Sequence, residues 1–273
     1  MTLITLLTDF GLQDEYVGVM KGVIATMAPD ATVIDLTHGI DPQDVTQGAY
    51  LLAAAYPYFP AGSIHVAVVD PGVGGSRRMV AMACDSHFFV APDNGILNRV
   101  LDRTRDQGLP ATAVYLENQD CFLKPVSPTF HGRDIFAPVA ARLAIGFPLE
   151  NLGPGVDPAL LQRSKTPRET VFRGPDLIGQ VIHVDRFGNL LTTIDQEELF
   201  EHGFWGPDAA NVRITLCDQS IEGIFSSYDA VPRHSLLAVV GSRGLLEISV
   251  NCGNAQEQLG AKKGTPVRVS PTE

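Results

Sequence analysis

The chain has 273 residues, which suits one large domain or two modest ones, and 45% of them are hydrophobic, enough for a substantial core. Its 20 basic and 31 acidic residues give a formal net charge of −11, so a nucleic-acid backbone would be repelled overall. The sequence contains no basic stripe, which also argues against nucleic acid as a partner.

The first half of the chain alternates segments typical of strands and helices. The apolar run over 64–69 has the pattern of a strand covered on both faces, and Tyr16–Met27 carries apolar residues at helical spacing. The expected strands are Leu3–Thr8, 33–36, 64–69, Met79–Cys84 and 88–91, and the expected helices are Tyr16–Met27, Val45–Ala55, 96–101 and 135–143. We therefore expect a layered α/β domain with a mainly parallel sheet over residues 1–160.

The second half has a different texture. Prolines and glycines, among them Pro167 and Pro175, predict a linker over 161–175. Beyond it the expected strands are 177–184, 190–194, Val212–Leu216, Leu236–Val240, Leu245–Val250 and 267–269. This pattern predicts a smaller β domain, a barrel or a sandwich, over residues 176–273.

The cysteines and the N-terminus indicate a compartment. The four cysteines have spacings that match no zinc or disulfide framework, so we expect reduced thiols at Cys84, Cys121, Cys217 and Cys252. The apolar N-terminus lacks a basic flank and is followed at once by Asp9, which favours a buried strand over a signal peptide. The longest uncharged stretch, 45–69, is interrupted by Pro57 and Pro60 and does not predict a membrane span. A cytoplasmic protein without membrane contact is expected.

Asp9 and Asp14 follow the first expected strand, in and just after the motif Thr8-Asp9-Phe10-Gly11. An ionised carboxylate offers only acceptors, so it can bind two hydroxyls of a ribose. Capping of the following helix is the alternative, and for Asp14 the two interpretations have equal weight. A protein-kinase interpretation of Asp-Phe-Gly fails, because no glycine-rich or catalytic loop precedes it.

A glycine-rich segment, Asp70-Pro71-Gly72-Val73-Gly74-Gly75-Ser76-Arg77, follows the third expected strand. It matches neither the GxGxxG nor the GxxxxGK[ST] phosphate loop. Its glycines would let the backbone approach a ligand closely, and a purely structural turn is the alternative. Asp70 and Arg77 are close enough in sequence to face each other across this loop.

Three further motifs carry polar residues at expected turns or helix starts. His131 lies in Thr129-Phe130-His131-Gly132-Arg133-Asp134, although a lone histidine is more often an ordinary surface or core group. Asp185-Arg186-Phe187-Gly188-Asn189 predicts a tight turn, with a left-handed Asn189 as the structural alternative. Gly241-Ser242-Arg243-Gly244 is not GxSxG, so it indicates no nucleophilic serine, but Arg243 could bind a carboxylate with two N–H groups.

Taken together, these motifs resemble one family along the chain from Ile4 to Val269: the adenosine-forming S-adenosylmethionine (SAM) hydrolases, or SAM hydroxide adenosyltransferases, and their halogenase relatives. Further matching motifs are Tyr16-Val17-Gly18, Ala91-Pro92-Asp93-Asn94-Gly95, Leu246-Glu247-Ile248 and Gly253-Asn254-Ala255. The resemblance implies an enzyme that uses water to split SAM into adenosine and L-methionine, with no metal or organic cofactor. It also implies a homotrimer whose site is shared between neighbouring chains.

The resemblance also implies roles for individual residues. Asp70, Arg77 and His131 match the water-orienting group of the hydrolases, and Asp9 matches the carboxylate that holds the ribose hydroxyls. The other substrate-binding positions that match are Asp14 and Asp185 near the methionine ammonium, Asn189 at the nucleoside, Tyr228 on the adenine, Ser242 and Arg243 at the methionine carboxylate, and Glu247 and Val250 along the adenine pocket.

Three alternatives compete with hydrolysis of SAM. A halogenase of the same family would place a halide where Asp70 repels an anion, and the halogenases carry Tyr, Thr and Ser at the positions of Asp70, Val73 and Gly132. A non-catalytic adenosine- or SAM-binding protein would need no Asp-Arg-His set. A calcium-dependent nucleoside hydrolase would need a denser carboxylate cluster than Asp9 and Asp14 provide.

Overall fold

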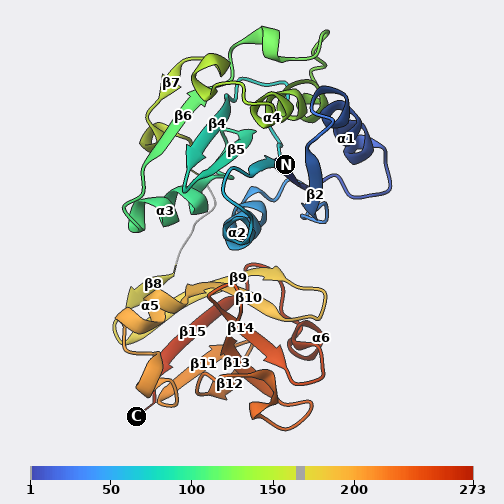
Figure 1. Ribbon diagram of the computed structural model, residues 1–273. Helices are drawn as coiled ribbons and strands as arrows, with labels where there is room; N and C mark the ends of the chain where they lie inside the picture. The colour runs from blue at the N-terminus through green and yellow to red at the C-terminus, as the bar shows by residue number, and fades with distance from the viewer. Residues whose placement is uncertain (1, 164–169, 273) are drawn as a thin grey trace. The chain divides into compact units, whose positions relative to one another are not determined.

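The computed structural model describes residues 2–163 and 170–272, and the chain divides into two compact units, Met1–Thr166 and Pro167–Glu273 (Figure 1). Each unit has its own buried apolar core. Residues 164–169, at the centre of the linker predicted over 161–175, lie outside the described residues, and the predicted domain limits at 160 and 176 stay a prediction. In the described part, no helix is long and apolar enough to cross a membrane.

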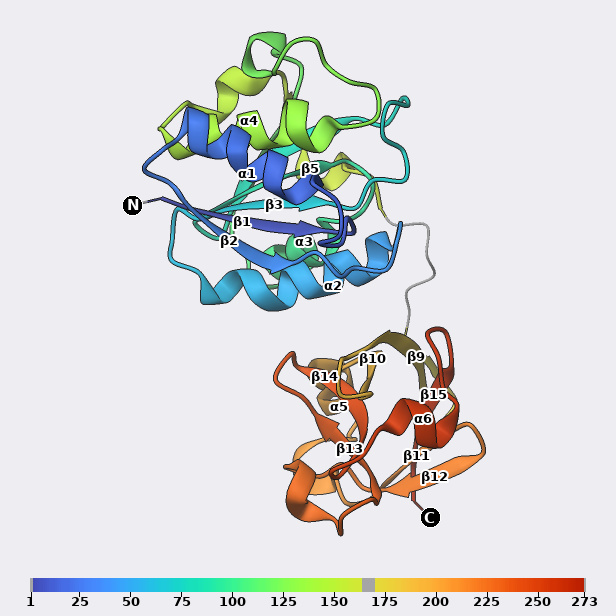
Figure 2. The same ribbon diagram turned by 90° about the vertical axis from the view of Figure 1, so that its right-hand side faces the viewer.

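A seven-stranded sheet forms the middle layer of the first unit (Figure 2). In spatial order its strands are β2 (Thr32–Thr37), β1 (Leu3–Thr8), β3 (Ile64–Val68), β5 (His87–Pro92), β4 (Met79–Cys84), β6 (Ala111–Tyr115) and β7 (Gly155–Val156). The pairs β2–β1, β1–β3 and β3–β5 are parallel, whereas β5–β4, β4–β6 and β6–β7 are antiparallel. The sheet is mixed, so the prediction of a mainly parallel sheet holds only for its first half.

Helices cover both faces of this sheet (Figure 2). One face carries α1 (Tyr16–Met27) and α4 (Ala137–Ala144), and the other carries α2 (Val45–Ala55) and α3 (Asn98–Asp106). Successive side chains of a strand point to opposite faces. Leu6 of β1 accordingly packs in the core with α1 and α4, while Leu7 packs in the core with α2 and α3. This double coverage explains why β3 is buried at every residue, as its apolar run predicted.

The carboxyl ends of β2, β1 and β3 meet at one edge of the sheet. Thr8 at the end of β1 pairs in parallel register with Val68 at the end of β3. The segments that leave these strands carry Asp9 and Asp70. In open α/β sheets this edge is where ligands bind.

The second unit is a β domain built on a nearly closed antiparallel sheet. In spatial order its strands are β12 (Gln219–Glu222), β11 (Val212–Leu216), β15 (Pro266–Pro271), β9 (Asp176–Val184), β10 (Leu190–Asp195), β14 (Leu245–Val250) and β13 (Leu236–Val240), with β8 (Val171–Arg173) beside β9. An isolated bridge between Phe225 and Val239 joins the segment after β12 to β13. Two short helices, α5 (Gln196–Glu201) and α6 (Ala255–Leu259), complete the unit, and a capping box of Asp195 and Glu198 starts α5.

Candidate active site

Asp70 and Arg77 face each other across the loop that follows β3. The Nε of Arg77 donates to Oδ1 of Asp70 at 2.9 Å and to Oδ2 at 3.0 Å, and its Nη2 donates to Oδ2 as well. The side chain of Arg77 is only 11% exposed and that of Asp70 only 5%. Two parallel N–H donors on one carboxylate make a charge-assisted pair with a fixed orientation. The loop holds the pair because Gly72 leaves room for the stem of Arg77: a Cβ on Gly72 would lie 3.1 Å from Cγ of Arg77.

His131 joins this pair from a distant part of the chain. Its Nδ1 lies 2.7 Å from Nη2 of Arg77, and because a guanidinium only donates, Nδ1 accepts and the ring proton is on Nε2. Burial lowers the pKa of His131, and the Arg77 charge lowers it further, against the opposing effect of Asp70 and Asp134. The ring is therefore neutral at pH 7 and presents Nε2–H as a donor.

A π-helical turn, Gly132–Phe136, follows His131 and continues into α4. Within it, Asp134 accepts from Nε of Arg133 at 2.6 Å and from the backbone N of Ser127 at 2.8 Å. Burial alone would raise the pKa of Asp134, but these hydrogen bonds and the Arg133 charge hold it below its usual value. The ionised carboxylate thus ties the segment around His131 together. Single π-helical turns are frequent at functional sites.

The loops that carry Asp70 and His131 touch at Gly74. This glycine has φ +73°, and a Cβ built on it would lie 2.2 Å from the carbonyl oxygen of Pro128. No side chain fits such a contact with backbone, and a left-handed φ also favours glycine. Gly74 therefore lets the loop of Asp70 and Arg77 pack directly on the segment that leads to His131.

A cavity of about 300 Å³ lies next to this group at the carboxyl ends of β1 and β3. It is lined by Asp9, Phe10, Gln43, Val68, Asp70, Pro71, Val73, Thr129, Phe130, His131 and Gly132. Asp9, Asp70 and His131, which are far apart in sequence, thus face one space. A concave site with a few convergent polar groups is the usual form of a small-molecule site.

The two N-terminal aspartates differ in their surroundings. Oδ2 of Asp9 accepts from the backbone N of Gln43 at 2.8 Å, so its carboxylate is oriented at the cavity. Asp14 is exposed in the segment before α1, and the residues that line the cavity do not include it. The N-cap of α1 is Glu15 rather than Asp14. Gln43 was missed from the sequence, because a backbone N–H acts there and carries no side-chain signal.

Asp185 closes the turn between β9 and β10. Its Oδ1 accepts from the backbone N of Phe187 at 2.8 Å and of Asn189 at 3.0 Å, and its Oδ2 accepts from Nδ2 of Asn189 at 2.9 Å. The left-handed residue of this turn is Gly188, with φ +82°, and not Asn189. Asp185 and Asn189 are therefore fixed relative to each other by an Asx-type turn.

Glu247 of β14 is the centre of a second polar group. It is 7% exposed, and its Oε1 accepts from the Tyr228 hydroxyl at 2.6 Å and from Oγ of Ser249 at 2.9 Å. Burial and the hydrogen bond to Glu247 raise the pKa of Tyr228, so its phenol stays protonated. The Asp185 carboxylate also raises the pKa of Tyr228, and the Arg243 guanidinium lowers it.

The remaining predicted residues of the second unit lie nearby in the chain. Ser242 and Arg243 are exposed in the turn 241–244 between β13 and β14. Val250 at the end of β14 has a buried core side chain, so only its backbone could face a ligand. Ser249 was missed from the sequence, although alternate residues of a strand share a face and Glu247 is two positions before it.

The described residues include no group of three or more His, Cys, Asp or Glu side chains that could hold a metal ion. All four cysteines are free: Cys84 and Cys121 are buried, and Cys217 and Cys252 are exposed. The first unit therefore has a carboxylate, a guanidinium and a neutral imidazole at a cavity. The second unit has a group of tyrosine, glutamate and serine side chains.

Comparisons with known proteins give one consistent result. Residues 4–153 match the SAM hydroxide adenosyltransferase N-terminal domain, and residues 179–268 match the SAM hydroxide adenosyltransferase C-terminal domain. An (R)-S-adenosyl-L-methionine hydrolase from Thermus thermophilus is 42% identical in an alignment of 272 positions that covers 96% of this chain and 97% of the relative. A fluorinase from Actinopolyspora mzabensis is 28% identical in an alignment of 298 positions that covers 98% of this chain and 97% of the relative. The crystal structure of an uncharacterized conserved protein from Thermotoga maritima matches with a TM-score of 0.87 and 36% identity, over 98% of this chain and 99% of that chain.

Proposed function

This chain belongs to the SAM hydroxide adenosyltransferase family, and from that membership we infer that it is an enzyme that hydrolyses S-adenosyl-L-methionine to adenosine and L-methionine. The observation that supports this most directly is the linked set of Asp70, Arg77 and His131 beside the cavity. A protein that only bound adenosine would have no use for such a set.

The reaction is a displacement at the ribose C5′ atom. An oxygen lone pair of water forms the C5′–O bond while the C5′–S bond breaks. The electron pair of the C5′–S bond stays on sulfur. The positive sulfonium becomes the neutral thioether of methionine, so the leaving group needs no acid. One proton of the water must be removed, and we assign its acceptance to Asp70. Alignment of this water behind C5′ supplies much of the rate by proximity.

Arg77 and His131 act on the same water. Arg77 holds the Asp70 carboxylate with two donors, and His131 lines the cavity with a neutral ring whose proton is on Nε2. Both stabilise the hydroxide character that develops on the water as it attacks. The Asp70 carboxylate also repels an anion, which favours water over a halide as the nucleophile.

We assign the remaining residues to substrate binding. Asp9 accepts from the ribose hydroxyls, and Asn189 contacts the nucleoside. Tyr228 stacks on the adenine with its hydroxyl held by Glu247, and Glu247 and the Val250 backbone line the adenine pocket. Asp14 and Asp185 attract the methionine ammonium, while Ser242 and Arg243 bind its carboxylate.

We place the enzyme in the cytoplasm as a homotrimer. Free cysteines at all four positions suit a reducing compartment. The proposed site residues divide between 9–131 in the first unit and 185–250 in the second. A site formed by the first unit of one chain and the second unit of its neighbour requires a head-to-tail cyclic assembly.

Incubation of the purified protein with SAM should yield adenosine and L-methionine, with an undiminished rate in the presence of a chelator. The proposed mechanism uses only Asp70, Arg77, His131 and water, so removal of divalent metal leaves it intact. Chromatography of the products with and without EDTA is the test. Activity lost with EDTA and restored by calcium would point to a metal-dependent nucleoside hydrolase instead.

A mixture of two inactive variants should recover activity if the site is shared between chains. Asp70→Asn disables the first-unit half of a site and Arg243→Ala the second-unit half, so a mixed trimer contains some sites with both residues intact. Co-expression with two different tags, purification through both tags and an adenosine assay make the measurement. Each variant expressed alone is the control, and a verified mixed oligomer without activity, or a monomer by light scattering, contradicts the shared site.

A further inference from the structure

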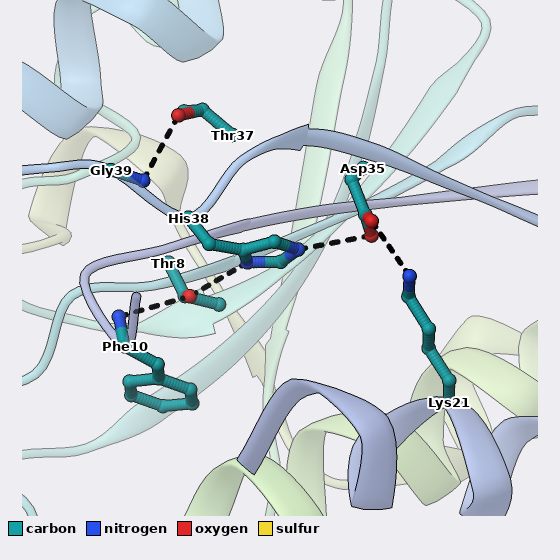
Figure 3. A network of polar contacts seen from close by, with 7 residues as sticks. All are labelled: Thr8, Phe10, Lys21, Asp35, Thr37, His38 and Gly39. Atoms are coloured by element: carbon teal, nitrogen blue, oxygen red, sulfur yellow. Dashed lines mark hydrogen bonds and ion pairs between the residues drawn. The ribbon is translucent and has the colours of Figure 1, made fainter. Parts of the chain in front are cut away.

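A chain of polar contacts runs from the surface of the first unit to the turn that holds Asp9 (Figure 3). At the outer end, Nζ of Lys21 on α1 donates to Oδ2 of Asp35 on β2 at 2.6 Å. Oδ1 of Asp35 lies 3.0 Å from Nε2 of His38, whose side chain is only 2% exposed. At the inner end, Nδ1 of His38 lies 2.9 Å from Oγ1 of Thr8, the last residue of β1. These contacts thus connect helix α1 and strand β2 to Thr8, the residue directly before Asp9.

The chemistry of the partners explains how these contacts combine. Burial would raise the pKa of Asp35, but the contacts with Lys21 and His38 hold it below its usual value, so its carboxylate is ionised and only accepts. His38 faces this carboxylate with Nε2 and faces Thr8 with Nδ1. The Thr8 hydroxyl has one proton and two lone pairs, so Oγ1 can meet Nδ1 and still accept from another donor.

That donor is the backbone N of Phe10, which lies 3.2 Å from Oγ1 of Thr8 and closes a small turn around Asp9. The segment that begins with His38 holds the same turn at two more points. The carbonyl oxygen of His38 accepts from the backbone N of Gly11 at 2.8 Å, and the backbone N of Gln43 donates to Oδ2 of Asp9 at 2.8 Å. The residues on both sides of Asp9, and its carboxylate, are therefore fixed by the 38–43 segment.

We propose that His38 is a positioning residue that, through Thr8, holds the Asp9 turn in the conformation that binds the nucleoside. The inference rests on the proposed function, in which Asp9 binds the ribose hydroxyls. His38 does not line the cavity that Asp9 faces, so it acts through the turn rather than on the ligand. A carboxylate that must meet two hydroxyls at once is sensitive to small rotations of its backbone, and the contact of His38 with Thr8 restricts these rotations.

Two replacements of His38 separate this role from a general contribution to folding. The amide group of His38→Asn falls near the place of Nδ1, so this variant keeps the contact with Thr8 and loses that with Asp35. The longer His38→Gln reaches Asp35 and loses the contact with Thr8. Each variant gives up one polar contact of the ring, so we expect similar losses of thermal stability.

Adenosine affinity should differ between them. By calorimetry, His38→Gln should bind adenosine about threefold to tenfold more weakly than wild type, the equivalent of one hydrogen bond, whereas His38→Asn should stay within about twofold. Thr8→Val should weaken adenosine binding to the same extent as His38→Gln, because valine has no oxygen to accept from the backbone N of Phe10. Thr8→Ser keeps this oxygen and should bind adenosine like wild type. Lys21→Gln is the matched control: it removes the exposed outer contact of the chain and should leave the affinity unchanged.

The comparison with Asp9→Ala separates failure of the inference from failure of the function. If wild type neither binds adenosine nor forms it from SAM, the proposed function is wrong and the inference falls with it. If Asp9→Ala weakens binding in a functional enzyme but His38→Gln and Thr8→Val do not, only the inference is overturned. Equal losses of affinity in His38→Asn and His38→Gln also overturn it, because they would reflect a role in folding alone.

Discussion

Replacement of Asp70 by Asn is expected to lower kcat about 10²- to 10³-fold, the scale for loss of one preorganised electrostatic group, with a much smaller change in KM. The isosteric amide keeps the volume of the side chain but accepts a proton far less readily than a carboxylate. Arg77→Ala and His131→Ala should each reduce kcat on the same scale. In the proposed mechanism all three side chains act on the water rather than on the nucleoside, so initial rates of adenosine formation over a range of SAM concentrations will separate the two parameters.

His131→Asn sharpens this test. Its amide can still contact Nη2 of Arg77 in place of Nδ1, but it has no counterpart of Nε2–H. If the ring served only to hold Arg77, this variant would keep wild-type kcat; we expect it to be as impaired as His131→Ala. Loss of one partner from a buried ion pair typically destabilises by about 3–5 kcal/mol, so the unfolding midpoint of every variant must be measured alongside. Near wild-type kcat in folded Asp70, Arg77 and His131 variants would refute the assignment.

The sequence predicted the layers of the first unit better than the direction of its strands. The apolar run at 64–69 correctly indicated a strand buried on both faces. Direction is not encoded in such a run, and β4 proved antiparallel to β5. A usable signal was present: only Asp85 and Ser86 separate these strands, and both have positive φ, +48° and +63°, as a two-residue hairpin requires. β6, a short strand over Ala111–Tyr115, was missed because a segment of this length has little periodicity.

Only part of the geometry of the candidate site could be anticipated from the sequence. Asp70 and Arg77 share one loop, so their pairing could be anticipated. The contact of Arg77 with His131 crosses 54 positions of sequence and depends on how the π-helical turn and the glycine-rich loop pack, which no local pattern reports. The role proposed for His38 has no signal in the sequence, because it depends on partners from β1 and β2 that come together only in the fold.

Replacement of Gly74 by Ala is expected to lower kcat about 10²-fold, similar to the loss of one member of the catalytic set. The new Cβ would lie 2.2 Å from the carbonyl oxygen of Pro128, so one of the two backbones must move. That movement separates the loop of Asp70 and Arg77 from the segment that leads to His131. The residues proposed to bind the nucleoside do not belong to these two loops, so KM for SAM should change less than kcat. Overpacking of this kind also lowers the free energy of unfolding by about 1–3 kcal/mol.

Gly108→Ala provides the matched control for this variant. Gly108 has a similar left-handed φ, +66° against +73° for Gly74, but a Cβ on Gly108 would meet nothing within 4 Å. This variant should therefore lose about 1–2 kcal/mol of stability from backbone strain alone and keep its kcat. If Gly74→Ala retained wild-type kcat as well, the contact with Pro128 would have no part in assembling the site. A fall in kcat in Gly74→Ala alone would attribute the effect to the separation of the two loops rather than to the strain of a left-handed alanine.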